Sequence, residues 1–379
     1  MELFYFFTIL VLIIFFINKR FSILLLVLGG MFFLINLPST GLDYDVYKLS
    51  YESSFMGNEF PFFSTESKLV SEPLYLFYTS LVRCLTGLSF SQFLAFNFLI
   101  CFYISYLAFK NISLNLFFYF WLLFLPIFFP TVFYFSPRSS LSFFMVMFGF
   151  LTTIKSKRKD NHARNLIRGL IFMFIGMMIH SQFIPIVLYV CFISFFCIHL
   201  KSNFKVYRNK ILIISISIFL ILKFSLSFLS YFESFLSLLP SSKLAVNKLH
   251  YLEDARKGFR LSGLFSIFVY PIMSFIIMKY FFKQRSFIGD RDLNRFKTLT
   301  MFLFGIAMFG AAVNLAFIDT PHLAGRLVRF SDYFCFSVAI PLILKIRYNN
   351  KLDLVILIAL FLLIPIVFPA VYHNTIWGF

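Results

Sequence analysis

Charged residues are scarce in this chain. Only 13% of its 379 residues are Asp, Glu, Lys or Arg, whereas 60% are hydrophobic and the mean hydropathy is +0.88. A soluble domain carries about a quarter charged residues. The shortage of charge therefore excludes an ordinary soluble fold. Apolar stretches of roughly 20 residues recur instead from end to end, and that length crosses a hydrocarbon core as a helix.

Several signatures of known chemistry are also missing from the sequence. The five cysteines have neither the spacing of a disulfide framework nor that of a metal site, so they are expected to serve packing. The sequence contains no Gly-rich phosphate loop ending in Gly-Lys-Ser/Thr, which argues against ATP-driven transport. It also lacks a Gly-x-Ser-x-Gly elbow and a His-Glu-x-x-His zinc motif.

The apolar stretches predict an all-α, polytopic transmembrane protein with about 12 spans, because a backbone in lipid must satisfy its own hydrogen bonds. No repeat or linker marks a boundary, so residues 1–379 are expected to form one domain. The predicted spans are 3–17, 21–37, 89–109, 112–130, 139–154, 166–181, 183–200, 211–229, 263–282, 298–317, 328–344 and 352–371.

Lys and Arg gather in alternate connections, chiefly in 155–168, 201–210, 279–297 and 345–351. The positive-inside rule makes that face cytoplasmic, with both termini outside. The net charge of +18 is then mostly topological, and its partners are anionic membrane lipids. The basic connections are short and contain no nucleic-acid module, so we expect no nucleic-acid partner.

The opposite, outer face has two sizeable loops near 38–88 and 230–262. The first is acidic and contains a short apolar stretch, Pro73 to Leu85, which is typical of a re-entrant or interfacial helix. Its tyrosines could stack on sugar rings, but an interfacial aromatic belt is the favoured interpretation for most of them: Tyr44, Tyr47, Tyr51, Tyr75 and Tyr78. The 61 phenylalanines are expected mostly to face lipid.

Three arginines at the predicted outer boundary depart from the positive-inside pattern. Arg138 begins one span, and Arg326 and Arg329 lie three apart near the start of another. Arginine at a membrane boundary is costly without a partner, and its planar fork grips phosphate oxygens. The three therefore indicate an anionic ligand such as a diphosphate. Snorkelling to lipid phosphates, or pairing with nearby aspartates, is the structural alternative.

Candidate bases also lie on the outer side. Asp43, in an Asp-x-Asp pair with Asp45, could act as a base or hold a divalent cation. Glu72 precedes the short apolar helix, and burial against apolar neighbours is expected to raise its pKa. His180 closes a predicted span at the same face and could equally be a satisfied polar group.

The order of these motifs resembles the EpsG/Wzy-like polysaccharide polymerases. Gly41-Leu42-Asp43-Tyr44 with Tyr47 is similar to the opening of their first outer loop, and Glu72-Pro73-Leu74-Tyr75 is similar to the start of their next helix. Arg138 and His180-Ser181 resemble a span-initial arginine and a span-terminal histidine. Arg326, Arg329 and Tyr333, running to Pro341, resemble a late Arg…Tyr-Phe…Pro segment in which both arginines compete for one position.

The resemblance implies a membrane glycosyltransferase, with a GT-C-like architecture as one form. It would polymerise undecaprenyl-diphosphate-linked repeat units of O-antigen or a related surface polysaccharide of the lipopolysaccharide type. The enzyme would lie in the bacterial inner membrane with its site facing the periplasm. Glu72, Asp43 or His180 would act as base, while Arg138, Arg326, Arg329, Tyr333 and Tyr47 would bind the substrate.

With arginines in place of a metal ion, no cofactor is expected. The lipid-linked oligosaccharide is the substrate, and a chain-length regulator protein is a candidate partner. The main alternative is a flippase for lipid-linked oligosaccharides, which would gather its cationic residues in a central cavity. The sequence leaves open the sugars, the linkage and the oligomeric state.

Overall fold

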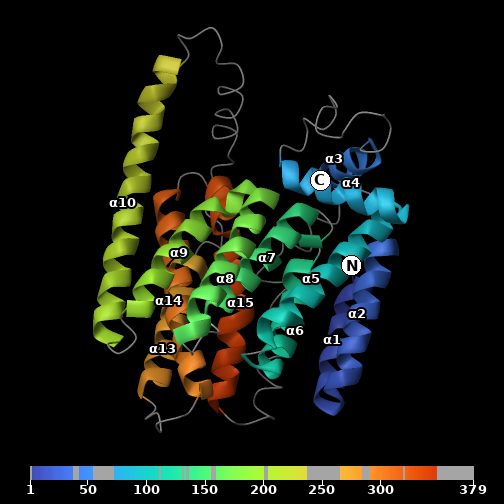
Figure 1. The fold of residues 1–379 in the computed structure, drawn as a ribbon, viewed down its shortest axis with the longest axis horizontal. Helices are drawn as coiled ribbons and strands as arrows, with labels where there is room; N and C mark the ends of the chain where they lie inside the picture. The colour runs from blue at the N-terminus through green and yellow to red at the C-terminus, as the bar shows by residue number, and fades with distance from the viewer. Residues whose placement is uncertain are drawn as a thin grey trace. The chain divides into compact units, whose positions relative to one another are not determined.

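All regular elements in the described part of the chain are helical in the computed structural model (Figure 1). The structure describes residues 2–36, 42–53, 72–110, 112–129, 132–133, 136–154, 159–199, 204–236, 265–283, 291–318 and 321–347. Its helices are α1 (Glu2–Ile17), α2 (Lys19–Asn36), α3 (Leu42–Ser53), α4 (Pro73–Thr86), α5 (Phe90–Phe109), α6 (Leu114–Phe129), α7 (Pro137–Ile154), α8 (Lys159–Ile179), the 3-10 turn η3 (Ser181–Phe183), α9 (Ile184–His199), α10 (Phe204–Leu236), the π-helical turn η4 (Phe265–Val269), α13 (Tyr270–Lys283), α14 (Arg291–Ala316) and α15 (Pro321–Arg347).

The helices coincide with the predicted spans. One lies over each predicted span from 3–17 to 328–344, and the last, 352–371, lies outside the described residues. Among the described helices, four stretches are long and apolar enough to cross a membrane: Lys19–Asn36, Phe90–Phe109, Ser266–Lys283 and Arg295–Ala316. The all-α class and the membrane character are therefore supported, while the count of 12 spans and the GT-C-like architecture stay predictions.

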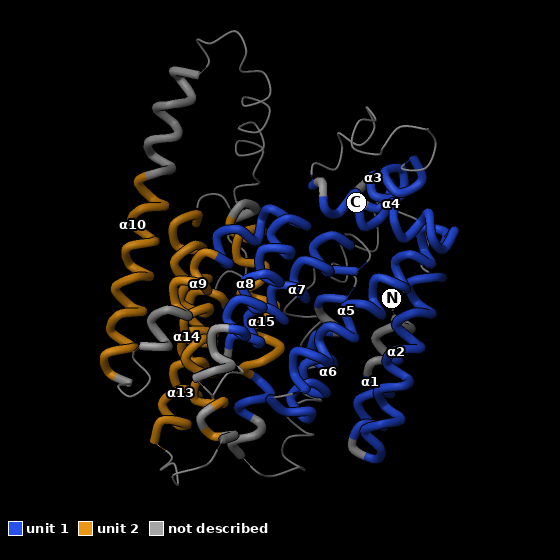
Figure 2. Tube along the Cα trace, viewed as in Figure 1, with its two compact units in different colours: residues 1–187, 340–379 blue, residues 188–339 orange. Residues whose placement is uncertain are grey.

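The chain divides into two compact units, which Figure 2 distinguishes by colour. The first comprises residues 1–187 and 340–379, and the second comprises residues 188–339. The prediction of one domain stays a prediction.

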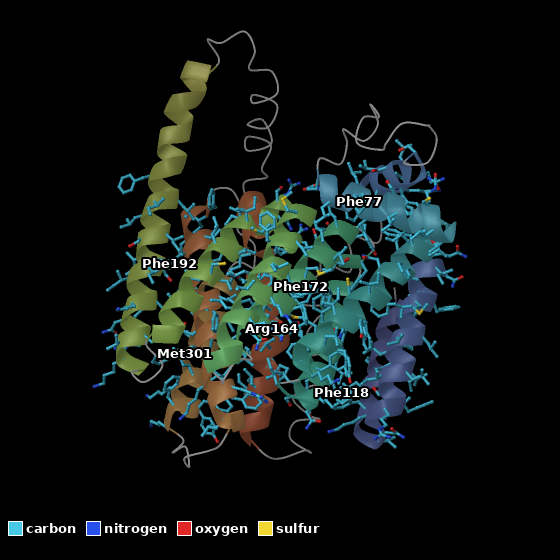
Figure 3. The ribbon with its side chains drawn as sticks, viewed as in Figure 1. Phe77, Phe118, Arg164, Phe172, Phe192 and Met301 are labelled. Atoms are coloured by element: carbon cyan, nitrogen blue, oxygen red, sulfur yellow. The ribbon has the colours of Figure 1, made fainter. Side chains whose placement is uncertain are left out.

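Several helices each have a stripe of exposed apolar side chains along one face. On α8 the stripe is formed by Ile167, Ile171, Phe174 and Met178, which are between 43% and 57% exposed. Figure 3 labels two further exposed side chains, Phe77 on α4 and Phe192 on α9. Contiguous exposed apolar surface of this kind is unfavourable in water and fits contact with lipid chains.

The interior of the first unit is built largely from aromatic rings. The indole of Trp121 stacks on the ring of Phe144 with centroids 5.3 Å apart, and its Nε1 donates to Oγ of Ser105 at 2.8 Å. The rings of Phe98 and Phe133 pack edge-to-face at 5.2 Å in the same core. The expectation that phenylalanine mostly faces lipid is wrong for this unit, because aromatic pairs fill the space between its helices.

Helices α7 and α8 form a hairpin whose backbones touch, and Figure 1 shows them side by side. A methyl group on Gly149 would lie 2.5 Å from the carbonyl oxygen of Gly169, and one on Gly176 would lie 3.1 Å from that of Ser142. The hydroxyl of Ser142 donates to the carbonyl of Gly176 at 2.6 Å. Small residues permit this close approach, which is typical of helix pairs in membranes. The hairpin brings the beginning of α7 next to the end of α8.

The two loops predicted to be outer contain more helix than the sequence indicated. The short helix expected from Pro73 is present as α4, but α3 was not predicted. The sequence pattern that indicates α3 is the spacing of Tyr44, Tyr47 and Tyr51, which fall on one helical face. All three are buried. The predicted loop 230–262 begins later than expected, because α10 continues to Leu236.

We predict that Gly149→Ala destabilises the α7–α8 hairpin by about 1–3 kcal/mol, because the added methyl group meets backbone that cannot move aside. The measurement is the thermal unfolding midpoint of the detergent-purified protein. Phe174→Leu, on the exposed face of α8, is the control and should change the midpoint little. A midpoint for Gly149→Ala equal to that of the wild type would contradict this close packing.

Candidate functional site

Three of the predicted site residues meet in the first unit, although they are far apart in the sequence. Arg138 forms an ion pair with Oε2 of Glu72, and Nδ1 of His180 lies 2.9 Å from the other carboxylate oxygen, Oε1. The side chains of Glu72 and His180 are only 8% and 7% exposed, and that of Arg138 is 24% exposed. The carboxylate thus bridges the two cationic or basic groups, and Arg138 is the member nearest to solvent.

Glu72 is placed by the beginning of α4. It occupies the N-cap position with extended backbone, φ −96° and ψ 108°, and Pro73 follows at the first helical position. Proline is favoured there because its fixed φ suits the helix and the missing N–H is not needed. The Glu72 side chain makes no capping hydrogen bond, so both carboxylate oxygens turn towards Arg138 and His180.

Arg138 is placed by the first turn of α7. The buried side-chain amide of Asn97, on α5, donates to the carbonyl of Pro137 at 3.3 Å and to Oγ of Ser140 at 2.8 Å. The hydroxyl of Tyr78, on α4, donates to Oδ1 of Asn97 at 3.2 Å. This network ties α4, α5 and α7 together at the level of the ion pair.

His180 is placed by the end of α8. Its backbone N–H donates to the carbonyl of Gly176 at 3.1 Å, and its own backbone is extended with φ −151° and ψ 110°. The imidazole packs against the ring of Phe183, with centroids 5.9 Å apart. The close glycine packing of the hairpin therefore decides how far His180 lies from the beginning of α7 and from Glu72.

Tyr47 supports the cluster from α3. The guanidinium carbon of Arg138 lies 5.4 Å from the centroid of the Tyr47 ring, within the range of a cation–π contact. Tyr47 is 7% exposed, and its ring packs against that of Tyr75 with centroids 6.1 Å apart. Because Tyr44, Tyr47, Tyr51 and Tyr75 are all buried, the interfacial-belt interpretation is wrong for these four. The role of Tyr47 in substrate binding stays a prediction.

The ionisation of Glu72 differs from expectation. Burial is the largest single influence and opposes the charged form, but the hydrogen bond with His180 and the charge of Arg138 together outweigh it. The pKa of Glu72 therefore lies below its ordinary value, not above it as the sequence suggested. Glu72 is a carboxylate at neutral pH, poorly suited to hold a proton and well suited to orient its neighbours.

The other predicted site residues belong to α15 and α3. Arg326, Arg329 and Tyr333 are on α15 in the second unit, spaced so that they share one helical face. Their participation in the site of the first unit stays a prediction. Asp43 belongs to α3, but its side chain lies outside the described residues.

Sequence reasoning missed the residues that hold the cluster in place. Asn97, which is fully buried, is the main one, and Ser140 is its partner on α7. The available signal was the position of Asn97 inside the apolar stretch Phe90–Phe109, because polar side chains in such stretches usually bind another helix.

Within the described ranges, no three His, Cys, Asp or Glu side chains lie together as a metal site would require. Metal independence stays a prediction. Comparison of the chain with protein-family models, with curated proteins and with solved structures gives no match.

The arrangement has the parts of an acid–base site beside an anion-binding site. A carboxylate that accepts a hydrogen bond from Nδ1 of a histidine fixes the tautomer and makes Nε2 the basic nitrogen. Arg138 uses one terminal nitrogen on Glu72, and its Nε is buried with no hydrogen-bond partner in the described structure. A guanidinium has five N–H donors, so Arg138 can bind an anion while it remains paired with Glu72.

We predict that Glu72→Gln lowers stability at neutral pH by on the order of 1–3 kcal/mol, because it leaves the half-buried charge of Arg138 without its carboxylate. A carboxyl whose pKa is lowered on folding stabilises the fold above its ordinary pKa and loses that effect as pH falls through the lowered value. The difference between wild type and Glu72→Gln should therefore narrow as pH falls from about 6 towards 3.

Thermal unfolding midpoints across that pH range test this prediction, with Glu52→Gln on the exposed face of α3 as the matched control. If the unfolding midpoint of Glu72→Gln equals that of the wild type at every pH, the ion pair contributes nothing to the stability of the fold.

Proposed function

We propose that this protein is a membrane glycosyltransferase that polymerises repeat units linked to undecaprenyl diphosphate, for O-antigen or a related surface polysaccharide. The observation that carries the proposal is the meeting of Glu72, Arg138 and His180 from three separate helix ends. Such an array supplies a base and a cationic group, which the transfer of a glycosyl group from a diphosphate requires.

His180 is the base in this proposal. Its Nε2 removes the proton from the acceptor hydroxyl on the non-reducing sugar of the incoming unit. The hydroxyl oxygen attacks the anomeric carbon of the growing chain, and the bond from that carbon to the phosphate oxygen breaks with inversion. Glu72 acts as a positioning residue, because its lowered pKa and its hydrogen bond keep it ionised against Nδ1 of His180.

Arg138 stabilises the leaving group. The electron pair of the broken bond stays on the diphosphate, whose added negative charge the guanidinium neutralises. The net charge of the cluster also changes when His180 takes up the proton. With His180 neutral, the charges of Glu72 and Arg138 cancel. Once His180 has taken the proton, the cluster is net positive as the diphosphate becomes more negative.

The other residues predicted from the sequence have secondary roles in the proposed reaction. Arg326, Arg329, Tyr333 and Tyr47 keep the substrate-binding role that the resemblance implies, with the two arginines as candidates for binding the diphosphate. Asp43 is the alternative base. The reaction would take place at the periplasmic face of the bacterial inner membrane, and a chain-length regulator would act as a partner.

The decisive assay is the banding pattern of surface polysaccharide on gels, in cells lacking the gene and complemented with variants. Wild type should restore the ladder. Arg138→Ala and His180→Ala should each leave core plus one repeat unit, because losing a charge-stabilising donor costs about 10²–10³-fold in rate. Arg329→Ala should behave in the same way if it joins the site.

Arg20→Ala and Glu52→Ala remove exposed charges of the same kinds and should restore a normal ladder. Membrane levels of each variant must match the wild type. Normal polymerisation by both Arg138→Ala and Arg329→Ala would exclude the leaving-group role. If cells lacking the gene do not make even the single repeat unit, the chain acts earlier, and a flippase becomes the better interpretation.

The purified protein should polymerise lipid-linked units without a divalent metal, because arginine replaces the metal as the charge-neutralising group. Activity measured with and without EDTA should be equal. Loss of activity in EDTA with recovery in Mg²⁺ or Mn²⁺ would show that a metal ion takes part.

A further inference from the structure

A second polar cluster lies in the second unit and contains none of the residues assigned to the reaction. Oδ1 of Asp332 on α15 is buried and has no hydrogen-bond partner within the described structure. The hydroxyls of Ser266 on η4 and Ser331 on α15 are likewise buried without a partner there, and each residue is 1% exposed. Buried polar atoms in proteins are nearly always hydrogen-bonded, so three such oxygens in one unit require an explanation.

Ser266 connects the other two residues of the cluster. A methyl group on Gly310 of α14 would lie 3.0 Å from Oγ of Ser266 and 3.5 Å from Oγ of Ser331, so both hydroxyls face the same glycine. The Ser266 hydroxyl also lies close enough to the Asp332 carboxyl to stabilise its charged form, although the pair does not have the geometry of a regular hydrogen bond. Gly310 therefore lets η4 and α15 bring these oxygens close to the backbone of α14, where the Cβ of any other residue would crowd the hydroxyl of Ser266.

The backbone next to the cluster is irregular. Ser266 lies in the π-helical turn Phe265–Val269, directly before α13. Such turns interrupt the regular ladder of backbone hydrogen bonds and often occur at functional sites. Carbonyls released from a helical ladder are common ligands of Na⁺ in membrane proteins. Ser266 is also the first residue of the candidate span Ser266–Lys283, so the cluster lies at one end of that span.

We propose that Asp332, Ser266 and Ser331 form a binding site for a monovalent cation, Na⁺, on the second unit. All three groups offer oxygen atoms, the ligands that hard cations prefer. The single carboxylate balances one positive charge, which leaves the occupied site neutral in a low-dielectric surrounding. A divalent ion would leave an uncompensated positive charge. A proton would also neutralise Asp332, whereas a cation in addition uses the two hydroxyl oxygens as ligands.

The groups around Asp332 agree with this assignment. Tyr270 on α13 and Cys335 on α15 lie near the carboxylate, and both are neutral groups in their ordinary forms. Arg329 precedes Asp332 by one turn, but no ion pair joins these two among the residues that the structure describes. Among the described residues the carboxylate therefore has no ion-pair partner of the kind that a buried acid usually has.

The experiment compares the purified full-length chain in NaCl and in choline chloride at equal ionic strength and neutral pH. Saturable binding of radiolabelled Na⁺ is measured together with the thermal unfolding midpoint. Na⁺ should bind to the wild type and raise its midpoint, because a ligand that binds only the folded state stabilises it. Asp332→Asn should lose the saturable binding, and Ser266→Ala should weaken it.

Ser215→Ala is the matched control, because it removes a buried hydroxyl on α10 that also lacks a partner in the described structure. It should bind Na⁺ like the wild type. The proposal is overturned if the wild type shows no saturable Na⁺ binding, or if Asp332→Asn binds as well as the wild type. A midpoint that depends on pH through Asp332 but not on Na⁺ would identify a proton site and would also overturn it. Should Asp332→Asn fail to fold, the wild type and Ser266→Ala decide the matter.

This assay needs no polysaccharide substrate, so its result is independent of the proposed transferase activity. Gly310→Ala adds a further test, because its methyl group would enter the space between the two hydroxyls. Weaker Na⁺ binding by this variant is expected, and unchanged binding would place the cation elsewhere.

Discussion

A carboxylate that is 8% exposed can stay ionised only if the groups around it replace the water it has lost, and in this protein those groups are Arg138 and His180. This requirement constrains the packing of three helices in the first unit. Each partner must arrive from its own helix with its nitrogen within hydrogen-bond distance of one oxygen. A shift of any of the three helix ends by about 1 Å would leave a buried charge partly unpaired, which is strongly destabilising.

Two features of the surrounding structure hold the three helix ends in position. Glycines at the α7–α8 contact let the two backbones touch, and backbone contact leaves less freedom than contact through long side chains. Asn97 then connects α5 to the first turn of α7 and, through Tyr78, to α4. Hydrogen-bond networks of this kind are worth most in a low-dielectric interior, where an unmade bond is costly. The rigid frame and the Glu72–Arg138–His180 cluster are therefore parts of one arrangement.

The sequence predicted the helices well because apolar length is a strong signal, and a helix lies over every predicted span in the described residues. It also identified Glu72, Arg138 and His180 as candidates, since each is polar at the end of an apolar stretch. It could not show that they meet, because their contact depends on how α4, α7 and α8 pack. The pKa of Glu72 was predicted in the wrong direction for the same reason. Burial was visible in the sequence, whereas the two compensating partners were not.

Glu72 and Asp332 each have a carboxylate in surroundings that disfavour a charge, but the groups around the two carboxylates differ. Glu72 lies at a helix end where two nitrogen groups from other helices reach it, and its charge is satisfied within the protein. Asp332 lies within α15 beside two hydroxyls that also lack partners in the described structure. Hydroxyls can solvate a carboxylate but cannot neutralise it. In a low-dielectric surrounding the charge is then neutralised by a proton or by a bound cation, and the hydroxyl oxygens beside Asp332 are additional ligands that a cation can use. The difference between the two acids is therefore the physical reason to propose proton transfer beside the first and cation binding at the second.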